Sequence, residues 1–225
     1  MTDITLVIPA KFEKHSLPLV LEELKKFSYK IIIVLQENDI ETIQSIKGYD
    51  CEILYQKNKG YGDALINGIN NTKTQYFCIF NADGSFNPAE INNMHKKLKQ
   101  ENLEFVFASR YQKNSGSDDD TIITYFGNFF FTFLGKLLFK LNISDILYTF
   151  VLGKTEECKK LKLQRKDFTF CIELPVKSKL MNFKINSIES FERKRLAGFK
   201  KVNEFKDGFL ILIYMIKLFC SSRFK

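Results

Sequence analysis

The sequence has no tryptophan, only two histidines, and no pair of cysteines at the spacing of a metal or redox motif. The five cysteines lie far apart and partly inside apolar runs, so we expect reduced core residues of a cytosolic protein. The two histidines, His15 and His95, have no partner visible in the sequence. We therefore expect both on the surface and predict neither a catalytic triad nor a zinc site.

Long apolar runs and export signals are also missing. No apolar stretch reaches the roughly 20 residues that a membrane-spanning helix needs. The nearest candidate, residues 209–219, is interrupted by Lys217. Residues 1–9 carry no basic segment before a long apolar run, so no export signal is expected. Any membrane contact should be peripheral.

The composition is that of a globular protein with a basic surface. Its 225 residues suit one domain, or one domain with an appendage, and 45% hydrophobic with 27% charged residues exclude a disordered chain. The net charge of +8, carried mostly by lysine, should attract anions such as phosphates, nucleic acid or acidic lipid. The 23 phenylalanines are an excess that composition alone does not explain.

The first half of the chain alternates short β-rich runs with helical patterns. We expect strands at 4–8, 30–35, 52–55, 75–80 and 104–108, with helices at 17–27, 41–46, 63–70 and 89–100. Strands that alternate with helices indicate βαβ units. The sequence therefore predicts an α/β fold with a mostly parallel sheet, of the kind that binds nucleotides.

The second half contains a polar loop and two strongly apolar helices. Residues 112–120 are rich in Gly, Ser and Asp and predict a mobile loop. Residues 125–141 and 205–219 are expected to be helices with wide apolar faces, accompanied by lysines. Such faces are typical of packed core helices, but they also suit an interfacial surface that rests on acidic lipid. Both interpretations stay open at this point.

An acidic turn follows the apolar run 76–79. Residues 80–88 read Phe-Asn-Ala-Asp-Gly-Ser-Phe-Asn-Pro, so a carboxylate follows a buried strand and precedes a helix that begins near a proline. In open α/β sheets, ligands bind at the carboxyl ends of the strands. Alone, this string is more often an ordinary turn. We take Asp83 as the first candidate site residue because matching segments stand at other strand ends.

Those segments occur in a fixed order along the chain. They are 7–13 (Val-Ile-Pro-Ala-Lys-Phe-Glu), 58–65 (Asn-Lys-Gly-Tyr-Gly-Asp-Ala-Leu), 108–111 (Ala-Ser-Arg-Tyr), 170–173 (Phe-Cys-Ile-Glu) and 195–201 (Arg-Leu-Ala-Gly-Phe-Lys-Lys). With the Asp83 turn, they resemble the family 2 glycosyltransferases of GT-A fold, and within these the dolichyl- or polyprenyl-phosphate sugar transferases. The resemblance covers nearly the whole chain.

This resemblance implies one GT-A domain over residues 1–225, with a Rossmann-like, mostly parallel sheet flanked by helices and amphipathic helices near the C-terminus. Residues 1–111 would bind a nucleotide sugar, and residues 112–225 would form the acceptor side. The implied enzyme is an inverting hexosyltransferase that acts on polyprenyl phosphate in cell-envelope synthesis. It is expected in the cytoplasm, peripherally on the inner face of the cell membrane, without a nucleic-acid partner.

The resemblance also assigns residues. Catalytic roles fall to Asp83, Glu173 and Arg195, and Asp83 with Asn81 would hold Mg²⁺ or Mn²⁺ at the family's D-x-D position. The expected substrate-binding residues are Pro9, Ala10, Glu13, Gln36, Glu37, Gly60, Asp63, Asn81, Ser85, Arg110, Asp145 and Lys201.

Several of these residues have structural alternatives. Arg110 suits a phosphate but is equally suited to a surface ion pair. Asp145 matches the family's acceptor-side aspartate, yet a helix cap or turn also uses this residue type. Glu173 lies in an apolar context, so its carboxylate must either pair with a cation or have a raised pKa.

Departures from the family pattern keep other functions open. Asn81 replaces the first Asp of D-x-D and adds no charge, so metal affinity should be lower. Residues 35–38 lack the family's usual base-reading aspartates, which leaves the base open. A sugar-hydroxyl acceptor would need a carboxylate base, for which Glu173 and Asp145 are candidates. A non-catalytic binding paralogue is a further alternative. Phosphate-loop NTPases and nucleotidyltransferases are disfavoured, because their glycine-rich loops with a basic residue are missing.

Overall fold

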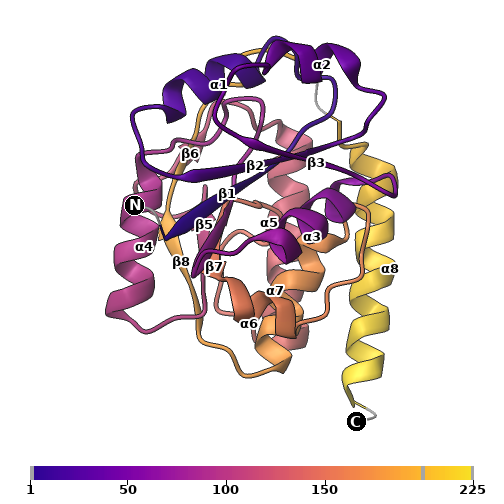
Figure 1. Ribbon diagram of the computed structural model, residues 1–225. Helices are drawn as coiled ribbons and strands as arrows, with labels where there is room; N and C mark the ends of the chain where they lie inside the picture. Colours follow the sequence, from indigo (N-terminus) through magenta and orange to yellow (C-terminus); the bar gives the residue numbers. More distant parts are fainter. Residues whose placement is uncertain (1–2, 199–200, 224–225) are drawn as a thin grey trace.

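The computed structural model describes residues 3–198 and 201–223. A seven-stranded sheet lies between two layers of helices, and a second, two-stranded sheet lies beside it (Figure 1). In spatial order, the strands of the large sheet are β3 (Glu52–Tyr55), β2 (Lys30–Leu35), β1 (Ile4–Pro9), β4 (Tyr76–Ile79), β7 (Val151–Lys154), β5 (Phe105–Ser109) and β8 (Ile185–Glu189). The small sheet pairs β6 (Gly116–Ser117) with β9 (Phe191–Glu192).

The helices divide between the two faces of the large sheet, each with its own apolar cluster. One cluster involves α1 (Leu17–Leu24), α2 (Ile40–Ser45) and α4 (Glu90–Gln100). The other involves α3 (Tyr61–Asn71), α5 (Ile122–Phe139), α6 (Thr155–Lys160), α7 (Phe170–Leu180) and α8 (Glu204–Arg223). The predicted α/β fold and its alternation of strands and helices are confirmed, with β2 and β3 at the predicted bounds.

The sequence did not predict β7, which lies inside the sheet between β4 and β5. It runs antiparallel to both neighbours, β4 and β5, whereas the other adjacent strands of the large sheet are parallel. Its first three residues are buried, so this short strand lacks the alternating pattern that marks a half-exposed strand. Because it is antiparallel, the segment that precedes it lies at the edge where the parallel strands end.

The expectation of a surface position for His95 is wrong. His95 is 6% exposed on the inner side of α4, together with Ile91, Met94 and Leu98. Its ring packs edge-on against Tyr76, with centroids 4.7 Å apart. The spacing of these four residues is that of an inward helical stripe. In a helix with so many polar residues, this short stripe is easily overlooked.

The phenylalanine excess has two causes. Some phenylalanines fill the core, among them Phe77, Phe80 and Phe105, which are fully buried. Others, such as Phe126 and Phe129, are on the surface of α5. Within the described residues, α5 is also the helix long and apolar enough to cross a membrane, although that is weak evidence by itself. It is longer than the stretch 209–219 singled out from the sequence, which corrects that choice.

Candidate active site

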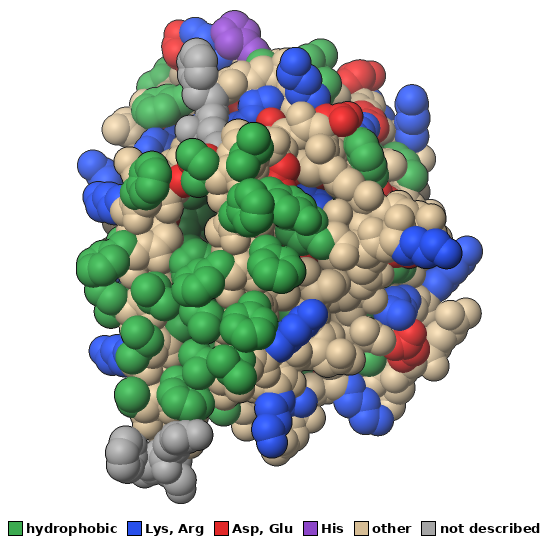
Figure 2. Space-filling view, turned by 180° about the vertical axis from the view of Figure 1, so that it is seen from behind, with side chains coloured by type: hydrophobic (Ala, Val, Ile, Leu, Met, Phe, Trp, Pro, Cys, Tyr) green, Lys and Arg blue, Asp and Glu red, His purple; other side chains and the backbone are tan. Residues whose placement is uncertain are grey.

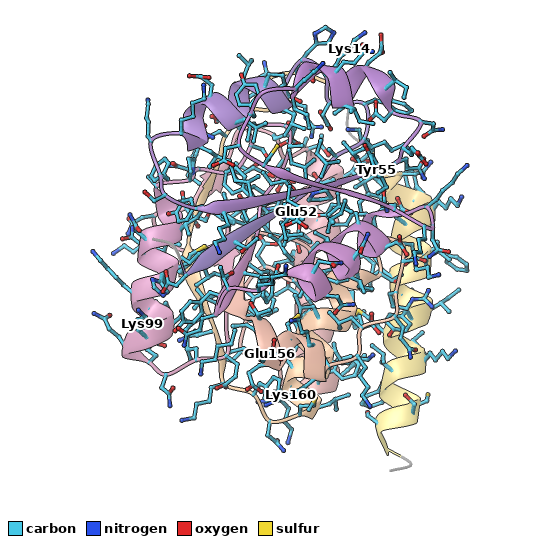
Figure 3. The ribbon with its side chains drawn as sticks, in the orientation of Figure 1. Lys14, Glu52, Tyr55, Lys99, Glu156 and Lys160 are labelled. Atoms are coloured by element: carbon cyan, nitrogen blue, oxygen red, sulfur yellow. The ribbon has the colours of Figure 1, made fainter. Side chains whose placement is uncertain are left out.

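The residues that the sequence placed at strand ends surround one cavity. Its volume is about 480 Å³, and it opens at the edge where β1 to β5 end, as expected for an open α/β sheet. Figure 3 labels Glu52 and Tyr55, the first and last residues of β3, and so shows the direction of the parallel strands. The predicted residues that line the cavity are Pro9, Ala10, Glu13, Gln36, Gly60, Asn81, Asp83, Arg110, Arg195 and Lys201.

The turn that carries Asp83 is held by hydrogen bonds among its own residues and by Leu196. Its Oδ1 accepts a hydrogen bond of 3.0 Å from the main-chain N–H of Ser85, and the Ser85 hydroxyl lies 3.3 Å from the Asn81 amide nitrogen. Gly84 has a φ of +82°, which favours glycine, and a Cβ there would lie 2.6 Å from the Leu196 side chain. Leu196 also donates its N–H to the Asp83 carbonyl at 2.8 Å. The buried Ser85 therefore supports the turn and does not line the cavity.

The loop after β1 is held by a residue that the sequence analysis missed. Asp39, at the N-terminus of α2, accepts a 2.6 Å hydrogen bond from the N–H of Phe12, whose φ is +55°. Glu13 is 7% exposed; the Ser16 hydroxyl donates to its Oε2 at 2.6 Å, and Lys201 pairs with its Oε1. Glu13 is thus a fixed carboxylate at the cavity wall. It lies beside a cation from the far end of the chain.

Gly60 lets a second loop approach the site closely. Its φ of +127° is unfavourable for other residues, and a Cβ would collide with the carbonyl of Lys166. The main-chain N–H of Asp63 donates to the same carbonyl at 3.1 Å. The Asp63 carboxylate, in the first turn of α3, accepts from the Asn58 amide at 3.1 Å and does not line the cavity. In this structure Asp63 makes a local contact, and the substrate contact expected from it stays a prediction.

Arg195 lies between two carboxylates. Its Nε donates to Asp119 Oδ1 at 3.0 Å, its Nη2 pairs with the other oxygen of Asp119, and its Nη1 lies 4.0 Å from Asp83 Oδ2. The hydrogen bond with Asp119 raises the pKa of the Arg195 guanidinium. A permanent cation therefore stands next to Asp83. Of the basic segment that carries it, residues 199 and 200 lie outside the described part of the chain.

Arg110 is an ion-pair residue. Its Nε and Nη2 donate to the two oxygens of Asp145 at 2.8 and 3.1 Å, and its Nη1 donates to Glu192 at 3.0 Å. Its guanidinium also lies 4.5 Å from the ring centre of Tyr148. Asp145 is fully buried, receives a further hydrogen bond from Asn128, and does not line the cavity. In this structure Asp145 positions Arg110, and the acceptor contact expected from it stays a prediction.

Glu173 is buried in α7 and does not line the cavity, and its catalytic role stays a prediction. Its carboxylate accepts hydrogen bonds from the N–H groups of Gln164 and Arg165, at 2.9 and 2.8 Å, and contacts the Tyr214 hydroxyl at 3.3 Å. Lys177 supplies the cation at 2.8 Å. Burial in an apolar helix did require a partner, as the sequence indicated. The partners fasten the loop at 164–167, which lies against Gly60.

Glu37 is exposed and does not line the cavity, whereas its neighbour Gln36 does. The sequence analysis missed Asp119 and Asp120, which line the cavity from the polar loop. Their signal was the run of three aspartates directly before an apolar helix. Burial raises the pKa of the Glu192 carboxyl, which lines the same wall.

The oxygen donors near Asp83 suit a divalent cation only in part. No group of three or more His, Cys, Asp or Glu side chains within residues 3–198 and 201–223 is arranged to hold a metal. Asp83 and Asn81 both line the cavity and offer a carboxylate and an amide oxygen. Mg²⁺ is commonly bound by one or two carboxylates together with substrate phosphates. The two residues therefore fit a cation whose remaining ligands come from a bound diphosphate.

Solved structures share this architecture. Glucosyl-3-phosphoglycerate synthase from Mycobacterium tuberculosis, in complex with Mn²⁺, UDP and glucosyl-3-phosphoglycerate, matches with a TM-score of 0.71 and 14% identity over 98% of this chain and 80% of that chain. Mannosyl-3-phosphoglycerate synthase from Rubrobacter xylanophilus matches with a TM-score of 0.67 and 12% identity, over 96% and 73%. The fold is that of the GT-A glycosyltransferases.

The sequence comparison gives the family. The family model of glycosyl transferase family 2 matches residues 5–161, from β1 to the end of α6. The chain belongs to this family. Among curated proteins, an uncharacterized protein of Methanocaldococcus jannaschii is 26% identical over 141 residues, which are 60% of this chain. The match spans 58% of that relative's length.

Proposed function

We propose that the chain transfers a sugar from a nucleotide-diphosphate sugar to polyprenyl phosphate, with inversion, by in-line displacement. The observation that supports this most is the meeting of Asp83, Arg195 and Lys201 in one cavity at the carboxyl edge of the sheet. Family membership supports the reaction class. Within the cavity, Asp83 and the cations Arg195 and Lys201 line the place where a diphosphate is proposed to bind.

Arg195 and Lys201 can stabilise the negative charge that develops on the leaving group during the reaction. The leaving nucleoside diphosphate gains negative charge as the glycosidic bond breaks, and fixed positive groups lower the energy of that state. Arg195 can bind two phosphate oxygens at once, and Lys201 adds a point charge. Both now pair with carboxylates, Asp119 and Glu13. Phosphate oxygens of the donor would compete for these cations.

The donor's other parts find partners along the same edge. Glu13 and Gln36 line the cavity where β1 and β2 end, and are proposed to contact the ribose and the base. Asp83 and Asn81 would hold a divalent cation, which when bound offsets the charge of the diphosphate. Asn81 adds no charge of its own, so the cation is expected to bind mainly together with the donor.

The proposed acceptor is argued from apolar residues that also line the cavity. Phe131 and Ile211, from α5 and α8, and Leu147 give the lining apolar side chains. Such a lining suits an isoprenoid chain attached to the acceptor phosphate. A phosphate is already an anionic nucleophile at neutral pH, so positioning matters more than a general base.

Transfer to a hydroxyl group is the second candidate, and Asp119 and Asp120 favour it. Both line the cavity, whereas the base candidates Glu173 and Asp145 do not. Asp119 and Asp120 are therefore better candidates for a general base. A hydroxyl acceptor needs a carboxylate near it to accept its proton. The M. tuberculosis synthase also has a complex with phosphoglyceric acid, a small phosphate-bearing molecule. A comparison of acceptors must therefore include a soluble one.

Donor binding is tested by thermal shift with UDP-, GDP- and CDP-linked sugars, with and without Mn²⁺ or Mg²⁺. At a donor concentration of about 100 times Kd, stabilisation is about 2.7 kcal/mol, or roughly 5–10 °C for a chain of this size. Asp83→Ala should lose the metal-dependent part of the shift. Asp63→Ala, which changes an aspartate outside the cavity lining, is the matched control.

Acceptor choice is then measured by transfer of labelled sugar. Polyprenyl phosphate should be used in preference to phosphoglycerate and to a free sugar. A protein that no nucleotide sugar stabilises would contradict the donor assignment. One that binds a donor but transfers only to a hydroxyl would replace the proposed acceptor.

A further inference from the structure

Two neighbouring helices turn large apolar side chains to the solvent. Phe126, Phe129, Phe133 and Leu137 of α5, with Phe209 and Ile213 of α8, recur every three or four residues along their helices and are about half to two-thirds exposed. We call these six residues the apolar face. Hydrophobic side chains gather in one broad area in Figure 2, the view of the molecule from behind. Large contiguous apolar patches on the surface of a soluble protein mark interaction sites.

The opposite side of α5 packs against the protein core. Asn128 pairs with the buried Asp145, and the Thr132 hydroxyl accepts a hydrogen bond of 3.2 Å from the N–H of Ile146. A membrane-spanning position of α5 would break these contacts and expose their polar groups to lipid, which is costly. The helix can therefore use its exposed side while it stays packed. This is the arrangement of an interfacial helix.

Charge around the apolar face has one sign. The exposed charged side chains on the described parts of α5 and α8, with the residue that ends α5, are Lys136, Lys140, Lys206 and Lys217. The acidic residues of α8, Glu204 and Asp207, are only partly exposed and line the cavity. Lysines beside an apolar face suit an anionic lipid surface. In a symmetric dimer through this face, the same lysines would be brought close to one another.

The apolar face continues into the cavity. Ile123 of α5 is 52% exposed and also lines the cavity. Gly127 of α5 and Gly208 of α8 line it as well, and a Cβ on Gly127 would meet nothing within 4 Å. A molecule whose apolar part lies in a bilayer could therefore reach the cavity between the two helices.

We propose that the apolar face docks the protein peripherally on an anionic lipid bilayer, with α5 and α8 parallel to the membrane surface. Docking turns the side of the cavity between these helices toward the lipid. The proposed docking surface is inferred from α5 and α8 and does not depend on the proposed function. Its use for presenting an acceptor rests on the proposed function.

The test is co-sedimentation with vesicles of phosphatidylcholine, with and without phosphatidylglycerol, in the absence of any donor. Wild-type protein should bind the anionic vesicles and dissociate as salt is raised. The double variant Phe126→Ser/Phe129→Ser should lower the partition coefficient by at least about tenfold. Leu19→Ser/Ile40→Ser, which removes two exposed apolar side chains on the other helix layer, should bind like wild type.

A second pair of variants tests the charge. Lys136→Gln/Lys217→Gln should weaken binding about fivefold for each lysine removed. Lys26→Gln/Lys96→Gln has the same net charge and should bind like wild type. The thermal shift with nucleotide sugars, measured on every variant, should not change. It therefore separates a failure of docking from a failure of the proposed function.

Three results would overturn the proposal. The first is a wild-type protein that does not bind anionic vesicles at low salt. The second is a Phe126→Ser/Phe129→Ser variant that binds as well as wild type. The third is a dimer in light scattering that this variant converts to a monomer, which would assign the apolar face to a second copy of the chain.

Discussion

Replacing Glu173 by glutamine separates a positioning role from a catalytic one. The buried carboxylate accepts two main-chain hydrogen bonds, from Gln164 and Arg165, and pairs with Lys177. Hydrogen bonds to a charged group contribute about 1.5–3 kcal/mol, against about 0.5–1.5 for neutral pairs. Weakening two such bonds and removing the ion pair should lower the free energy of unfolding by about 3 kcal/mol. For a chain of this size, that corresponds to a fall in Tm of about 6–12 °C.

Activity should respond differently. The loop at 164–167 lies against Gly60, so a looser loop should raise KM for the donor severalfold while kcat changes little. Calorimetry gives the Tm, and steady-state transfer gives the two kinetic constants. Glu156→Gln is the control, because Glu156 of α6 (labelled in Figure 3) is 76% exposed in its pair with Lys159. Exposed pairs contribute at most about 1 kcal/mol.

Two results would refute this reasoning. An unchanged Tm in Glu173→Gln would mean that the carboxylate does not fasten the loop. A kcat reduced a thousandfold at unchanged KM and Tm would support Glu173 as a catalytic residue. Only a group that contacts the reacting atoms removes transition-state stabilisation in that manner.

Three further predictions follow from the same structure. Asp83→Ala should abolish transfer, whereas Asn81→Asp should retain it and bind Mn²⁺ more tightly in calorimetry, because it adds a charge to a hard-cation site. Burial lowers the pKa of His95 below 6.5. The unfolded chain therefore binds the proton more readily than the folded one, and the free energy of unfolding should fall as pH drops below about 6.5. His95→Gln should reduce that pH dependence in urea titrations. Exposed Cys220 should react with a thiol reagent in the native protein, whereas Cys78, which is fully buried and whose pKa burial raises, should react only on unfolding.

Local patterns were enough to predict the five strands of the first half of the chain and one edge of the site. The expected strands at 30–35 and 52–55 match β2 and β3, because short runs of strand-favouring residues between helical patterns indicate strands without knowledge of their partners. Parallel strands end at one edge, so Glu13, Gly60 and Asp83 could be placed together from their positions after strands. The structure has all three in the lining of one cavity.

Long-range pairing decided what the sequence alone did not predict. β7 joins β4 to β5 although it is antiparallel to both, and this insertion brings Asp145 to Arg110. Glu173 was expected to be catalytic from the family resemblance, and its apolar context indicated that the carboxylate needs a partner. The partners come from a loop eight and nine residues earlier and from α8, and sequence spacing does not show on which side of a helix such groups meet.

The two apolar helices show the same division between sequence and tertiary structure. Their apolar periodicity and lysines are visible in the sequence, and both a core and an interfacial interpretation agree with that pattern. An apolar stripe shows that a helix has something to bury, but not whether the protein itself buries it. That depends on which side the remaining elements cover. Here α5 packs through Asn128 and Thr132, while Phe126 and Phe129 stay exposed, so only the tertiary structure decided which side of α5 faces the solvent.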